Sequence, residues 1–184
     1  MPLKFESGPS LEGYEDRISE GLHLIDEPLL KSTSVRIIGP VPVYSATVLL
    51  KNPILRWKEL VSVGWRALVL EDAKPISLIL IHPTVSNGSM SIAIRGAESA
   101  VAFYRALVAA EELGAKLNGN YYVNFITFPN IYVTAVWLKG KSSFFIPTRD
   151  GSRSRPEPKI LNRQTFLKLV RTQNQRIRGQ LKTR

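Results

Sequence analysis

Residues 118–147 read NGNYYVNFITFPNIYVTAVWLKGKSSFFIP and contain three apolar runs in succession. Two short interruptions, Pro129-Asn130 and Lys139-Gly140-Lys141, separate the runs and consist of residues that suit turns. The runs themselves are rich in β-branched and aromatic side chains, which pack well on a pleated surface. This stretch therefore predicts a three-stranded antiparallel meander.

The first two strands of the predicted meander carry large apolar side chains on both faces. Successive side chains of a strand point to opposite faces, so Val123 and Phe125 face one side while Ile126 and Phe128 face the other. Strands of this kind lie centrally in a sheet that is covered on both sides. We expect the cover to come either from helices of the same chain or, in a homo-oligomer, from another chain packed on an apolar sheet face.

The rest of the chain predicts strands and helices around this meander. Apolar positions spaced by three and four residues predict an acidic amphipathic helix near 12–27, and a segment rich in alanine and leucine predicts a helix over 97–113 that Gly114 ends. Strands are expected over 33–38, 41–51, 65–70, 75–82 and 89–95. One short helix is expected over 53–61. The sequence thus predicts an α+β fold with a mixed, mainly antiparallel sheet.

The character of the chain changes after Thr148. Residues 149–158, RDGSRSRPEP, hold turn formers and charges but no core residue, which is typical of a linker. Residues 161–184 predict a helix that Asn162 caps, that continues to about Gln175 and that frays at Gly179. We therefore divide the chain into a loose terminus over 1–10, a globular domain over 11–148 and a basic tail over 149–184.

Composition narrows the function classes. The chain has 184 residues, of which 44% are hydrophobic and 22% charged, so it is long enough to bury a core. It has no cysteine, which excludes disulfides, thiolate nucleophiles and cysteine metal sites. No secretory signal is visible at the start, and no apolar run approaches the roughly 20 residues of a membrane-spanning helix. These features predict a cytoplasmic protein without integral membrane association.

One formal motif lies inside the meander, where AVWLKGKS at 135–142 fits a loose form of the phosphate-binding loop. That loop needs a helix directly behind its lysine, whereas Ser143 to Pro147 predict another strand. We therefore predict a plain turn at 139–141. A strand-to-helix junction at 95–99 could offer free N–H groups to an anion, but Glu98 already complements the start of its helix.

A catalytic site is the alternative to a binding role. His82 ends the strand ISLILI, and a hydrolase-like site could pair it with Ser86 or Ser89 as nucleophile and Asp72 as the orienting acid. Strand-end histidines are usually structural, so we rank this reading second. With two histidines and no cysteine, the sequence predicts neither a metal site nor a cofactor.

Charge gives the strongest functional signal. Residues 1–30 carry two basic and seven acidic side chains, whereas residues 151–184 carry ten basic and one acidic. Such asymmetry favours contact between the basic tail and an acidic partner, either a protein, a nucleic acid or the acidic helix near 12–27. The sequence therefore predicts a non-enzymatic binding or adaptor protein. The expected anion-binding or nucleic-acid-binding residues are Arg153, Arg155, Lys159, Arg163, Lys168, Arg171, Arg176, Arg178 and Lys182.

Overall fold

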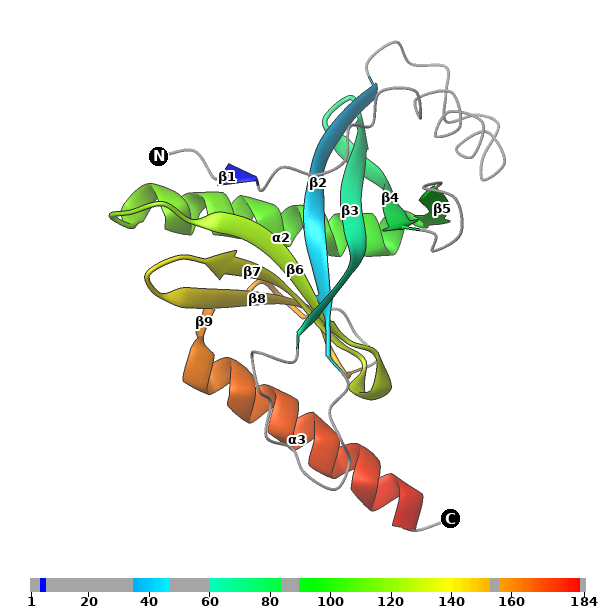
Figure 1. The fold of residues 1–184 in the computed structure, drawn as a ribbon, viewed down its shortest axis with the longest axis vertical. Helices are drawn as coiled ribbons and strands as arrows, with labels where there is room; N and C mark the ends of the chain where they lie inside the picture. Colours follow the sequence, from blue (N-terminus) through cyan, green and yellow to red (C-terminus); the bar gives the residue numbers. More distant parts are fainter. Residues whose placement is uncertain (1–3, 6–34, 47–59, 84–89, 153–155, 183–184) are drawn as a thin grey trace.

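The computed structural model describes residues 4–5, 35–46, 60–83, 90–152 and 156–182. In this part of the chain nine strands form one sheet, which two α-helices accompany (Figure 1). The strands are β1 Lys4–Phe5, β2 Val35–Ser45, β3 Val61–Glu71, β4 Lys74–Pro83, β5 Met90–Arg95, β6 Tyr122–Phe128, β7 Val133–Lys139, β8 Ser143–Asp150 and β9 Leu161–Asn162. The helices are α2 Ala97–Lys116 and α3 Arg163–Lys182, and a short 3-10 helix, η3, covers Pro129–Ile131.

The order of the strands is β5-β4-β3-β2-β6-β7-β8-β9, and β1 also pairs with β6. All pairs are antiparallel except those of β2 and β1 with β6. Helix α2 makes the connection from β5 at one edge to β6 in the middle of the sheet. The predicted α+β fold with a mixed, mainly antiparallel sheet is therefore confirmed.

The predicted meander is present as β6, β7 and β8. Its first turn is η3, after which Tyr132 adopts a left-handed conformation with a φ of 55°. Its second turn contains Gly140 and Lys141 between two strands, so the chain has no strand–loop–helix arrangement at this motif. A Cβ on Gly140 would lie 2.7 Å from the Tyr121 ring, and the glycine therefore lets the turn pack against that ring.

Helix α2 covers one face of the sheet. Its buried side chains Phe103, Ala106 and Ala110 belong to a core cluster that also contains Phe125 of β6 and Leu78 of β4. The rings of Phe103 and Phe125 meet edge to face with centroids 5.5 Å apart, a favourable aromatic geometry. This alanine-rich helix packs close to the sheet because small side chains face it.

Three predicted boundaries are wrong. Helix α3 does not end near Gln175 or fray at Gly179 but continues to Lys182. Helix α2 does not end at Gly114 but continues to Lys116, because Gly114 is itself buried against the sheet. Residues 35–45 form one strand rather than two, since the Gly39-Pro40 step is a local irregularity in the β2–β3 register and not a turn. The segment 65–70 is a strand, as predicted, and belongs to β3.

Helix α3 covers the opposite face of the meander. Phe166 and Val170 are buried in a second cluster with Phe128 and Phe145, and the rings of Phe145 and Phe166 stack with centroids 4.2 Å apart. Asn174 continues the same inward face and is also buried. Both faces of the meander are thus covered by helices of the same chain, and the C-terminal helix supplies one of the two covers.

Several predictions fall outside the described residues. They are the helix near 12–27, the short helix over 53–61 up to residue 59, the loop residues 84–88 with Ser86, the alternative nucleophile Ser89, and the basic residues Arg153 and Arg155. Val61, the predicted last residue of the short helix, is the first residue of β3.

Candidate functional site

His82 lies at the exposed end of β4, where its Nδ1 donates a hydrogen bond to the carbonyl oxygen of Val63 at 3.0 Å. Asp72 lies at the other end of the hairpin, in the turn between Glu71 and Lys74. Asp72 and His82 are ten positions apart, almost all of them along the extended strand β4, which is a distance of roughly 30 Å. The structure therefore does not bring these two proposed catalytic partners together, and the hydrogen bond gives His82 a structural role at the strand end.

Helix α3 carries most of the predicted anion-binding residues. Asn162 caps its start, because its Oδ1 accepts a hydrogen bond from the backbone N–H of Thr165 at 2.9 Å. This N-cap was predicted and is confirmed. The helix has 20 residues, none of them acidic, and its buried side holds Phe166, Val170 and Asn174.

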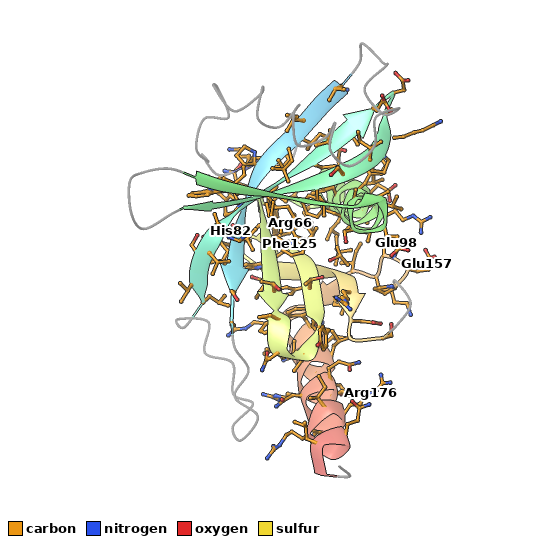
Figure 2. The ribbon with its side chains drawn as sticks, turned by 90° about the vertical axis from the view of Figure 1, so that its right-hand side faces the viewer. Arg66, His82, Glu98, Phe125, Glu157 and Arg176 are labelled. Carbon is orange, nitrogen blue, oxygen red and sulfur yellow. The ribbon has the colours of Figure 1, made fainter. Side chains whose placement is uncertain are left out.

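The basic side chains lie away from that buried side. Arg163, Lys168, Arg171 and Arg176 are exposed and Arg178 is half-buried, while Lys182 is the last residue of the helix. Lys159 is exposed just before β9. In the view of Figure 2, Arg176 and Glu157 lie on the right-hand side of the molecule and His82 lies on the left. The predicted basic residues therefore gather along α3, away from the catalytic candidate.

Two neighbouring rows of side chains run along one flank of α3. Residues four apart in a helix lie on the same flank. Lys168, Thr172 and Arg176 form an exposed row, which we call the basic row. Beside it, Thr165, Leu169 and Gln173 form a second row. At 1.5 Å per residue, the ends of the basic row lie about 12 Å apart.

A cavity of about 630 Å³ opens beside this flank, between α3, the end of β8 and the segment 156–161. Its apolar lining comes from Pro147, Pro156, Leu161 and Leu169. The other lining residues are Asp150, Glu157, Lys159, Thr165, Lys168, Thr172 and Gln173. The cavity thus has an apolar part and a polar rim, and it includes the whole second row of α3 and part of the basic row.

The turn after β8 shapes one wall of the cavity. The Asp150 Oδ1 accepts hydrogen bonds from the backbone N–H and the hydroxyl of Ser152, at 2.9 and 2.5 Å. Gly151 adopts a φ of 83°, and a Cβ on it would lie 2.6 Å from the Gln173 Oε1. Glycine at this position therefore lets the turn close directly against α3.

Four charged side chains line the cavity, namely Asp150, Glu157, Lys159 and Lys168. The Glu157 carboxylate lies 3.9 Å from the Arg105 guanidinium of α2, and both side chains are exposed. Within the described residues, Lys159 and Lys168 have no ion pair or hydrogen bond from their ammonium groups. The lining thus holds two carboxylates and two ammonium groups, and further positive charge beside it comes from Arg176, the last residue of the basic row.

The sequence did not signal the cavity. Pro147, Leu161 and Leu169 belong to three different elements, β8, β9 and α3, and line one cavity because α3 packs beside β8. Leu169 gave the one local hint, since it is an apolar residue that lies beside the Phe166–Val170 face rather than on it.

Within the described residues, no three His, Asp or Glu side chains gather where they could hold a metal ion. The described helices include none that is long and apolar enough to cross a bilayer. Comparison of the chain with known protein families, with curated proteins and with solved structures found no match. What the site binds must therefore be argued from its own geometry and charge.

Proposed function

We propose that this protein is a non-enzymatic binding or adaptor protein, and that the exposed basic face of α3 contacts an acidic partner, a protein or a nucleic acid. One observation carries this proposal. The helix is anchored in the core through Phe166 and Val170, yet every charged side chain along its 20 residues is basic.

An anchored helix is a better binding surface than a free basic tail. A free tail loses conformational entropy when a partner orders it, whereas α3 is already ordered by its packing on the sheet. A cluster of exposed cations also attracts an acidic partner over distances of about a Debye length, which is roughly 8 Å at physiological ionic strength. Binding through α3 should therefore be strongly salt-dependent.

The test replaces cations of α3 without removing the helix. In the triple variant Arg171→Gln, Arg176→Gln and Arg178→Gln, we expect elution from a heparin column at clearly lower salt. The slope of log Kd for heparin against log salt should fall by about 2 to 3. Each cation that no longer contacts an anionic group of the ligand releases nearly one counterion fewer on binding.

A matched control removes three exposed cations from other parts of the molecule, through Arg36→Gln, Lys74→Gln and Lys116→Gln. Both triple variants have the same net charge. Equal shifts in the two variants would mean that heparin senses net charge alone, and this result would overturn the assignment to α3.

A further inference from the structure

We infer that the acidic partner is a protein segment in extended conformation, with a bulky apolar side chain that enters the cavity between α3 and β8. This inference rests on the proposed function and names the class of partner for the same face. It starts from the position of the cavity, which shares Lys168 and Thr172 with the basic row of α3.

The cavity fits an apolar anchor. Its volume of about 630 Å³ exceeds what one aromatic side chain fills, and Pro147, Leu161 and Leu169 supply apolar contact surface. In protein interfaces, a few aromatic or aliphatic anchors buried in such pockets dominate the binding energy. Charged side chains around the anchor add specificity and speed association.

A nucleic acid fits this cavity less well. Proteins that bind single strands stack the bases on aromatic side chains, and none of the described residues that line the cavity is aromatic. The carboxylates of Asp150 and Glu157 at its rim would also repel a phosphate backbone that entered it. An acidic peptide avoids both problems, because its carboxylates can contact the basic row while only its apolar anchor enters.

Spacing predicts the motif. Lys168 and Arg176 are separated by about 12 Å along α3, with Thr172 between them at the cavity. In an extended peptide, residues i and i+4 lie about 13 Å apart and share a face with residue i+2. The matching motif has an acidic residue at i, a bulky apolar residue at i+2 and another acidic residue at i+4.

The experiment compares three labelled peptides and one oligonucleotide by fluorescence anisotropy on the full-length protein. The first peptide contains Glu-Ser-Trp-Ser-Glu, the second has alanine in place of tryptophan, and the third has tryptophan moved next to one glutamate. The oligonucleotide is a twelve-nucleotide oligothymidylate. We expect the first peptide to bind at least about ten-fold more tightly than the other two peptides.

Variants locate the anchor. Leu169→Gln changes the apolar lining, and Thr172→Trp fills the cavity from an exposed position of α3. Either variant should reduce the preference for the tryptophan peptide to less than about three-fold, while elution from heparin stays unchanged. Leu181→Gln is the control, since Leu181 is an apolar residue of the same helix that is 59% exposed and does not line the cavity. It should keep the full preference.

The outcomes separate this inference from the proposed function. Equal affinity for the three peptides, with binding that salt abolishes, overturns the anchored peptide but leaves the acidic partner in place. Tighter binding of the oligothymidylate than of any peptide assigns the face to nucleic acid and also overturns the inference. If neither the peptides nor heparin bind, both proposals fail.

Discussion

Gly64 shows how one residue controls the shape of the sheet. It has a φ of 137° where the register between β2 and β3 shifts, next to the Val63 carbonyl that accepts the hydrogen bond of His82. A Cβ on Gly64 would lie 2.1 Å from the carbonyl oxygen of Ile81 in β4. Only glycine therefore allows β3 and β4 to approach each other at this point.

Gly64→Ala should lower the free energy of unfolding by about 2 to 5 kcal/mol, because it adds backbone strain and forces β3 and β4 apart. Urea unfolding followed by circular dichroism measures the change. Gly179→Ala makes the same chemical change inside α3, where a Cβ meets nothing within 4 Å. It should stabilise the protein by about 0.5 to 1 kcal/mol. Similar effects at the two sites would contradict this account.

At the scale of the element, α3 has two roles that its sequence keeps on separate sides. Phe166 and Val170 pack on the meander, while Lys168 and Arg171 remain exposed. The buried side of α3 holds few apolar residues, because Asn174, which follows Phe166 and Val170 on that side, is polar. The position of α3 over the sheet also creates the cavity, so packing and the proposed binding depend on the same helix.

A substitution at the N-cap of α3 tests how much this helix contributes to the stability of the protein, without removing the helix. Asn162→Ala removes the acceptor for the Thr165 N–H and should cost about 1 kcal/mol of stability. Asn162→Asp keeps the acceptor and adds a charge that favours a helix start, so it should retain or slightly raise stability. Thermal unfolding of both variants gives the comparison. A loss of the same size in the aspartate variant would show that the cap is not what matters at this position.

At the scale of the whole molecule, the two helices on opposite faces make the meander the centre of the core. The clusters beneath α2 and α3 meet opposite sides of β6, with Phe125 in one and Ile126 in the other. Removal of either helix would expose one of these clusters. The basic C-terminal helix is thus part of what holds the sheet.

A chain that ends at Pro158 should therefore lose cooperative unfolding and bind the dye anilinonaphthalene sulfonate, because Phe128, Trp137 and Phe145 lose their cover. The triple glutamine variant of α3 should unfold cooperatively and leave the dye unbound. Calorimetry and dye fluorescence distinguish the two proteins. A truncated chain that unfolds with the transition of the full-length protein would show that α3 is dispensable for the core.

The sequence by itself determined the elements whose signal is local. The meander over 118–147, the helix predicted over 97–113 and the N-cap at Asn162 follow from periodicity, turn residues and capping chemistry within short windows. It also determined the concentration of positive charge after residue 150, which needs only counting. The end of α2 was missed because burial of Gly114 overrides its usual role as a helix terminator.

Only the tertiary structure decided where the C-terminal helix lies and what forms beside it. The stacking of Phe166 on Phe145 joins residues from different elements. The side of α3 that packs on the sheet has too few apolar residues for the sequence to predict this contact. The cavity brings Pro147 together with Leu169, and the β3–β4 hairpin separates Asp72 from His82. These arrangements depend on long-range packing of whole elements, because side chains that carry no shared local pattern meet only after the sheet and its two helices have assembled.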